Sequence, residues 1–242
     1  MNLVVDIGNT FTKLAVFDRQ LIQDFIRTES NDTGRILQFA GDFQSIKAGI
    51  ISSVNREASG LNKILGEQFP CILLDHHTPL PFLNGYTSPE SLGKDRLAGI
   101  AAASAMFPHE EVLVMDAGTA ITLDLLTADS TYRGGSISPG IGMRYRALNT
   151  FTGRLPLLEA IDEASLTGNT TAGSIHSGVL NGVVTEVEGF INRYLARYPS
   201  LKIILTGGDY KYFDKQLKVK TFAAPNLVLE GLNIILNYNL EK

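Results

Sequence analysis

Apolar and polar residues form blocks that predict strands and helices in succession. Residues 2–12 and 112–122 each begin with an apolar run typical of a buried strand and then reach a glycine turn. A second apolar stretch follows each turn, at residues 14–17 and 121–126. Because a strand, a tight glycine turn and a return strand form a β-hairpin, the pattern predicts two similar hairpins and a duplicated unit.

Longer segments with apolar residues at helical spacing predict helices. The predicted helices cover residues 61–69, 94–107, 174–198 and 231–240. Residues 202–209 predict a strand that ends in a Gly-Gly turn, whereas residues 76–91 and 134–142 are rich in proline or glycine and predict irregular turns. The alternation of strands and helices indicates an α/β fold.

The repeated hairpin divides the chain into two halves. A length of 242 residues permits one large domain or two small ones. Pro108 ends the predicted helix that precedes the second hairpin, and polar residues follow it up to Glu111. We therefore expect two domains, residues 1–110 and residues 111–242.

The composition is that of an ordinary globular protein, with 44% apolar and 19% charged residues. A net charge of −4 gives no reason to expect nucleic acid as a partner. The one cysteine, Cys71, cannot form an internal disulfide and suits a reducing compartment. The first residues lack the pattern of a signal peptide, and no apolar run approaches the roughly 20 residues that span a bilayer. We expect a cytoplasmic protein without a membrane partner.

Both hairpins carry aspartate, glycine and threonine at the same spacing. The matched pairs are Asp6 with Asp116, Gly8 with Gly118, and Thr12 with Thr122. Glycine lets backbone N–H groups approach a phosphate closely, and threonine hydroxyls can donate to its oxygens. An aspartate beside a phosphate would be repelled unless a cation lay between them, so both aspartates indicate cation-holding groups.

The same residue types also suit ordinary turns, so one hairpin alone decides little. Two matching hairpins after buried strands, with a Thr-Gly-Gly-Asp turn at residues 206–209, favour nucleotide binding. Further donors are available from Asn9, Thr10, Lys13 and Thr119. The chain has no Walker sequence, no HExxH motif and no GxSxG elbow, which argues against a P-loop, a zinc-protease site or a hydrolase elbow.

These motifs resemble the actin-like ATPase superfamily, which includes acetate and sugar kinases, and within it the type III pantothenate kinases over nearly the whole chain. The matching segments are DIGNTFTK (6–13), GYTSPESLGKDR (85–96), DAGTAITLD (116–124), GGSISPGIG (134–142), TGRLP (152–156), GNTTAGSIHSG (168–178) and TGGD (206–209). The superfamily shares the hairpins, so the segment 85–96 is the more specific part. His176 departs from the pattern, where glutamine is expected.

The resemblance implies an activity and a fold. The activity is ATP-dependent phosphorylation of the terminal hydroxyl of pantothenate to 4'-phosphopantothenate, the first step of coenzyme A biosynthesis. The fold is a pair of ribonuclease-H-like domains with a cleft in which ATP and pantothenate meet. The resemblance also implies magnesium with ATP, a monovalent cation (potassium or ammonium), and a homodimer.

It further implies a role for each matching residue. Asp95 is expected to be the general base, Asp116 to bind the monovalent cation, and Thr119 to contact ATP. The ATP phosphates are expected to contact Asp6, Ile7, Gly8, Asn9, Thr10, Phe11, Thr12 and Lys13. Pantothenate is expected to contact Tyr86, Gly93, Lys94, Asp95, Arg96 and, from the other subunit, Thr171.

The position of Asp95 supports its role independently. It lies at the start of a predicted helix, where the helix dipole and the adjacent Arg96 should keep the carboxylate ionised. An ionised carboxylate can orient an alcohol and accept its proton during phosphoryl transfer. Arg96 can pair with a carboxylate such as that of pantothenate. The alternative is that Asp95 only starts the helix and Arg96 is its solvated neighbour.

The helix predicted over residues 174–198 supports a dimer. It combines a continuous apolar stripe with Gly178 and Gly182, and helix-interior glycines often mark the close approach of another backbone. A single small domain has difficulty covering both that stripe and its core, and symmetric dimers are the commonest soluble oligomers.

Two other functions compete with the pantothenate kinase interpretation. One is a different reaction on the same fold, by another sugar-like kinase or by a phosphatase acting on polyphosphate or guanosine pentaphosphate. The other is a non-catalytic regulatory relative that binds partners. Because Asp6, Asp95 and Asp116 are all present, the sequence favours an enzyme.

Overall fold

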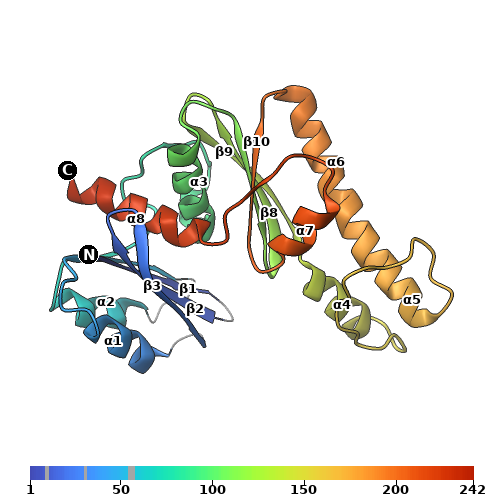
Figure 1. Ribbon diagram of the computed structural model, residues 1–242, viewed down its shortest axis with the longest axis horizontal. Helices are drawn as coiled ribbons and strands as arrows, with labels where there is room; N and C mark the ends of the chain where they lie inside the picture. Colours follow the sequence, from blue (N-terminus) through green and yellow to red (C-terminus); the bar gives the residue numbers. More distant parts are fainter. Residues whose placement is uncertain (9–10, 30–31, 54–57) are drawn as a thin grey trace. The chain divides into compact units, whose positions relative to one another are not determined.

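The computed structural model describes residues 1–8, 11–29, 32–53 and 58–242, and these divide into two compact units (Figure 1). The first unit contains Met1–Pro108, Ser130–Arg133 and Asn226–Lys242, and the second contains His109–Asp129 and Gly134–Pro225. None of the helices in the described ranges is long and apolar enough to cross a membrane.

The first unit is built on a five-stranded sheet in the order β3-β2-β1-β4-β5. Its strands are β1 (Asn2–Ile7), β2 (Phe11–Asp18), β3 (Leu21–Glu29), β4 (Ala48–Ser53) and β5 (Cys71–Leu73). The first three strands are antiparallel, and β4 and β5 run parallel to β1. The predicted first hairpin, β1–β2, is therefore confirmed.

Four helices cover the two faces of this sheet. They are α1 (Thr33–Gly41), α2 (Ala58–Gly66), α3 (Lys94–Met106) and α8 (Leu227–Leu240). Helices α1 and α2 bury an apolar core against one face, and α8 packs with α3 against the other (Figure 1). The alanine-rich α3 and Gly231 of α8 permit close contact, because a side chain at Gly231 would collide with the backbone of Ala98.

Helix α8, near the C-terminal end of the sequence, does not belong to the domain in which we predicted it. We expected residues 111–242 to form one C-terminal domain, but α8 belongs to the first unit. The physical reason is that α8 is apolar on most of its surface and is buried between α3 and the strands β1, β2 and β4. Its Asn233 and Asn237 also accept hydrogen bonds from the Asn2 side chain, at 2.9 and 2.8 Å.

The hairpin is repeated in a second sheet, whose order is β11-β10-β7-β8-β9-β6. The strands are β7 (Val112–Ala117), β8 (Ala120–Thr127), β9 (Thr131–Pro139), β10 (Lys202–Thr206) and β11 (Phe222–Ala223), with the short β6 (Leu83–Asn84) paired to the first residues of β9. Strands β7 and β8 form the second predicted hairpin, and β10 is the strand predicted before the Gly-Gly turn. The α/β class and the duplicated hairpin are confirmed.

Helices cover one face of this second sheet around an apolar core. They are α4 (Ile141–Thr150), α5 (Thr171–His176), a π-helical turn (Ser177–Asn181), α6 (Gly182–Arg197) and α7 (Tyr210–Gln216), while a 3₁₀ turn (Pro89–Ser91) lies in the first unit. The predicted helix 174–198 therefore begins earlier, at Thr171, and widens into a π turn around Gly178.

The segment 134–142 does not form the irregular turn that we predicted. Residues up to Pro139 continue strand β9, and Ile141 begins α4. The prediction was wrong because glycine is common in turns, whereas Gly135 lies within a strand. A side chain at Gly135 would collide with the backbone of Leu123 in β8. Glycine within a strand often marks such close approach of another backbone.

Candidate active site

Asp6 lies near the end of β1, which is flanked by strands β2 and β4. Asp6 lies opposite Lys13 of β2 and opposite Ser52 of β4. The Ser52 hydroxyl, which is almost fully buried, donates a hydrogen bond to the Asp6 carboxylate. The predicted contacts Asn9 and Thr10 lie outside the described residues.

Burial makes Asp6 a weak acid for an aspartate. Its pKa is raised to about 6, chiefly by loss of water and also by the nearby charge of Asp95, while the Ser52 hydrogen bond and Lys13 act in the opposite direction. The structure thus brings two carboxylates from distant parts of the sequence into electrostatic contact. A bound cation would relieve their repulsion.

This raised pKa predicts a pH-dependent cost to stability. A carboxyl whose folded pKa lies above its ordinary value of 3.8 makes the folded state bind more protons, so the free energy of unfolding falls as pH rises to about 6. We expect Asp6→Asn to stabilise the ligand-free protein at pH 8 by about 1–3 kcal/mol. The advantage should vanish at pH 4. Thermal unfolding at both pH values, with exposed Asp18→Asn as the control, measures it; an equal gain at both pH values would contradict this origin.

The catalytic candidate lies at the start of α3. One carboxylate oxygen of Asp95 accepts a hydrogen bond from the backbone N–H of Arg96, at 2.9 Å, and the side chain is exposed. A side chain at Gly93, two residues earlier, would meet the Asp95 carboxylate in its present position, so glycine leaves room for it. An exposed, ionisable carboxylate beside Asp6 is suited to take a proton from a bound alcohol.

Lys94 has a contact that sequence reasoning did not anticipate. Its amino group donates to the backbone carbonyl of Ser53, at 2.9 Å, and so ties the start of α3 to the end of β4. Because Ser53 follows Ser52, this bond links the element that carries Asp95 to the strand that supports Asp6. The structure gives Lys94 a positioning contact, and its contact with pantothenate stays a prediction.

Arg96 and Tyr86 form a second pair of expected site residues in the first unit. Arg96 is buried, with 8% of its surface exposed, and its guanidinium lies 5.6 Å from the centre of the Tyr86 ring. A guanidinium over an aromatic face is held in one orientation and can still pair with a carboxylate. The first unit thus brings Tyr86 to Arg96, and Asp6 to Asp95.

The second hairpin carries Asp116 at the corresponding strand end. Asp116 lies opposite Thr122 of β8 and opposite Thr206 of β10. Gly207, with φ of +94°, turns the chain beside it, and a side chain there would collide with both the Asp116 carboxylate and the Ala117 backbone. Thr119 is exposed at the hairpin turn, as a ligand contact requires.

The turn of the first hairpin is one residue longer than the turn of the second. Thr12 therefore does not occupy the position in its hairpin that Thr122 occupies in the other, as the matched spacing had suggested. In the first hairpin Asp6 faces Lys13 and Thr12 faces Ile7, whereas in the second Asp116 itself faces Thr122. Because successive side chains of a strand point to opposite faces, the extra turn residue puts Thr12 on the face away from Asp6. Thr12 is 0% exposed, and its hydroxyl finds no hydrogen-bond partner within the described part of the chain. A contact between this hydroxyl and ATP would need a local rearrangement.

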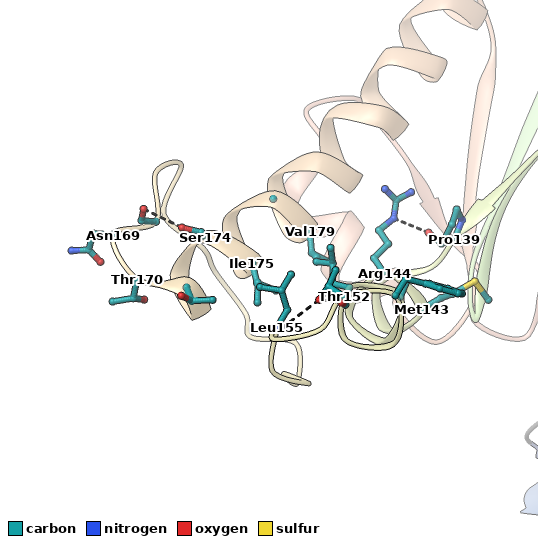
Figure 2. A pocket seen from close by; sticks show the side chains of 16 residues that line it. Pro139, Met143, Arg144, Thr152, Leu155, Asn169, Thr170, Ser174, Ile175 and Val179 are labelled. Carbon is teal, nitrogen blue, oxygen red and sulfur yellow. Dashed lines mark hydrogen bonds between the residues drawn. The ribbon is translucent and has the colours of Figure 1, made fainter.

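Thr171 lies elsewhere, on an apolar groove of the second unit (Figure 2). The groove has a volume of about 1340 Å³ and runs along α4 and the α5 helix. Figure 2 shows Ile175 and Val179 on its helix side, with Thr170 at one end and Arg144 at the other. Thr171 is exposed in the first turn of α5, whose start is capped by the Thr170 hydroxyl.

Two further residues lie beside the candidate site, and only one of them carries a sequence signal. Ser52 supports Asp6 through a strand pairing between segments distant in the sequence, and Asp209, whose pKa is raised by burial, follows the Gly-Gly turn beside Asp116. The Thr-Gly-Gly-Asp pattern marks Asp209, but serine in a buried strand is unremarkable. The departure at His176 also has a partner: its Nδ1 lies 2.8 Å from the Tyr145 hydroxyl.

The donor set fits magnesium bound together with a nucleotide. Within the described ranges, no three His, Cys, Asp or Glu side chains form a closed metal site. Magnesium does not require one, since it keeps several waters and takes one or two carboxylates plus phosphate oxygens. Asp6, whose charge is disfavoured by burial and by Asp95, is suited to such a cation.

Comparison with known proteins concerns the chain as a whole. A family model described as type III pantothenate kinase matches residues 2–193. Type III pantothenate kinases from Phocaeicola vulgatus and Christiangramia forsetii are each 43% identical, and in both cases the match covers 99% of this chain and 99% of the relative.

Solved structures show the fold. A Campylobacter jejuni structure described as a Baf family transcriptional activator has a TM-score of 0.64 at 23% identity, covering 99% of this chain and 100% of that one. A ROK family glucokinase from Streptomyces griseus, solved with glucose and AMPPNP, has a TM-score of 0.56 at 11% identity, covering 100% and 99%. With the matches over nearly the full length, the chain belongs to the type III pantothenate kinase family.

Proposed function

We propose that this protein transfers the γ-phosphoryl group of ATP to the terminal hydroxyl of pantothenate, the first step of coenzyme A biosynthesis. The observation that carries the proposal is the match to the family along 99% of the chain, joined to a site in which the expected base and a second carboxylate lie together. The family is one of kinases that act on an alcohol, so the phosphatase and the regulatory protein are not favoured.

The proposed chemistry begins at Asp95. Its exposed carboxylate accepts the proton of the hydroxyl as that oxygen forms a bond to the γ-phosphorus, and the bond from phosphorus to the bridging oxygen breaks to release ADP. Arg96, held against Tyr86, is proposed to pair with the pantothenate carboxylate and so aim the hydroxyl at ATP.

The hairpins are proposed to hold the ATP phosphates and their cations. Asp6 would hold magnesium, which when bound neutralises charge that develops on the phosphates. Lys13, opposite Asp6 in the hairpin, would add a positive charge. Asp116 would hold the monovalent cation, potassium or ammonium, and Thr119 would contact ATP. The half-buried Cys71 suits the reducing cytoplasm, which we propose as the compartment.

An acceptor screen tests the function. Purified protein is incubated with ATP, magnesium and potassium, and ADP release is followed for pantothenate, glucose, N-acetylmannosamine and acetate. We expect rapid release with pantothenate alone. Faster release with a sugar would replace the proposal by another kinase of this fold, and phosphate release without any acceptor would indicate a phosphatase.

We also propose a homodimer that uses the groove of the second unit. Large apolar side chains that line the groove are exposed in the single chain, including Phe151 at 85% and Met143 at 36%. Monomeric proteins rarely leave a broad apolar surface uncovered. Gly178 and Gly182 are exposed on the neighbouring helix with open space above them, so a second helix could approach closely. Thr171, on the same groove, would then serve pantothenate bound to the other subunit.

A charge on this helix is predicted to separate the subunits. Gly182→Glu would bury an unpaired carboxylate in the proposed interface, which is costly. Light scattering is expected to show a dimer for wild type and a monomer for the variant, and calorimetric titration should show weaker pantothenate binding with ATP binding retained. Gly60→Glu, at an exposed helical glycine of the first unit, is the matched control. A monomeric wild type that binds pantothenate normally would refute the dimer.

A further inference from the structure

A buried tyrosine from the middle of the chain supports the candidate acceptor site. Residues 130–133 lie in the second half of the sequence yet belong to the first unit. Within them, Tyr132 is 0% exposed, and its ring stacks on the ring of Tyr86 with centres 6.0 Å apart and planes inclined by 13°. Phe82 meets Tyr132 edge-on, with ring centres 6.5 Å apart, and adds to the packing around it.

The backbone of Tyr132 restrains the same segment. Its carbonyl accepts a hydrogen bond from the N–H of Gly85 at 3.0 Å, and the carbonyl of Ser130 accepts one from Leu83 at 2.9 Å. This is the pairing of β6 with β9, in which Asn84 lies opposite Tyr132. Gly85 is required, since a side chain there would collide with the Tyr132 carbonyl oxygen. Tyr132 therefore restrains this segment in two ways. Its carbonyl holds the backbone at Gly85, and its ring stacks on the ring of Tyr86.

The restraint continues from Tyr86 to Arg96. The buried guanidinium of Arg96 lies over the Tyr86 ring, so a tilt of that ring would change the surface on which the guanidinium rests. A side chain that only filled space could meet Tyr86 at any angle. The near-parallel stacking instead sets one orientation of the ring, and aromatic pairs favour defined geometries of this kind.

We propose that Tyr132 is a positioning residue for the acceptor: its ring orients Tyr86, and through Tyr86 the Arg96 guanidinium that pairs with the acceptor's carboxylate. This rests on the proposed function. Because Tyr132 acts on binding rather than on proton transfer, its loss should raise the KM for pantothenate and leave kcat nearly unchanged. An aromatic pair of this strength corresponds to about a three- to tenfold rise.

Three variants separate orientation from packing. Tyr132→Leu removes the ring, Tyr132→Phe keeps it, and Phe82→Leu removes the aromatic that meets Tyr132 edge-on while leaving both rings of the Tyr132–Tyr86 stack in place. We expect the pantothenate KM to rise in Tyr132→Leu, with the KM for ATP unchanged, and to return to the wild-type value in Tyr132→Phe. Phe82→Leu should lower the unfolding temperature with a much smaller change in this KM. If Tyr132→Leu does not fold, Tyr132→Met replaces it.

The outcomes distinguish this inference from the function on which it rests. A wild type that phosphorylates pantothenate, beside a Tyr132→Leu variant with unchanged pantothenate KM, would refute the positioning role alone. Equal KM increases in Tyr132→Leu and Tyr132→Phe, or a fall in kcat without a change in KM, would refute it as well. A wild type inactive toward pantothenate would overturn both, and calorimetric titration of pantothenate gives an independent reading of binding.

Discussion

Replacing Asp95 by asparagine is expected to lower the turnover number by about 10²- to 10⁴-fold, the usual contribution of a general base. The amide keeps the shape of the side chain and can still accept the hydrogen bond from the Arg96 N–H, but it cannot take a proton. Pantothenate should bind with nearly wild-type affinity, because Tyr86 and Arg96 are untouched. Steady-state kinetics and calorimetric titration measure the two quantities.

Glu90→Gln is the matched control for this experiment. Glu90 is an exposed acid on the 3₁₀ turn just before α3, so its variant removes a nearby charge while leaving Asp95 in place. We expect the control to keep wild-type turnover. Near-full turnover in Asp95→Asn would show that another group accepts the proton, and equal losses in the two variants would point to a general effect of charge.

Replacing Asp116 by alanine is expected to remove most activity together with its dependence on a monovalent cation. Asp116 ends a buried strand beside the Gly207 turn, where its carboxylate could hold a cation next to phosphates. The wild type should therefore require potassium or ammonium, with sodium a poor substitute. The variant should show a low rate that is insensitive to all three ions. A titration of each chloride salt at constant ionic strength gives both results.

Asp129→Ala serves as the control, because Asp129 is an exposed aspartate of the same unit beyond the far end of β8. It should keep the cation dependence of the wild type. Full wild-type activity in buffer free of potassium and ammonium would contradict the assignment of Asp116. Cation dependence that persists unchanged in Asp116→Ala would place the monovalent ion elsewhere.

Local patterns predicted the elements that depend on neighbouring residues. The two hairpins, the helix that begins at Lys94 and the strand before the Gly-Gly turn follow from apolar runs and glycine positions, and the structure contains them. The family resemblance also rested on local segments, and the comparisons confirm it. Local sequence is sufficient where a hairpin closes within a few residues.

Features that depend on distant segments could not be read in this way. One extra turn residue reverses the face of Thr12 relative to Asp6, and spacing alone made the two hairpins look equivalent. Gly135 signals a turn in sequence but fits a backbone in space. Helix α8 joins the first unit because its partner α3 is there, more than a hundred residues earlier. The roles of Ser52 and Tyr132 follow from their positions beside Asp6 and Tyr86, and only the pairing of distant strands creates those positions.

The central claim is tested most directly by the mass of the reaction product. Wild-type protein is incubated with pantothenate, magnesium, potassium and ATP labelled with ¹⁸O in the terminal phosphoryl oxygens, and pantothenate is recovered for mass spectrometry. The proposed reaction predicts a single phosphate ester at the terminal hydroxyl that carries the label, formed in step with ADP. Unmodified pantothenate beside labelled inorganic phosphate would contradict the claim.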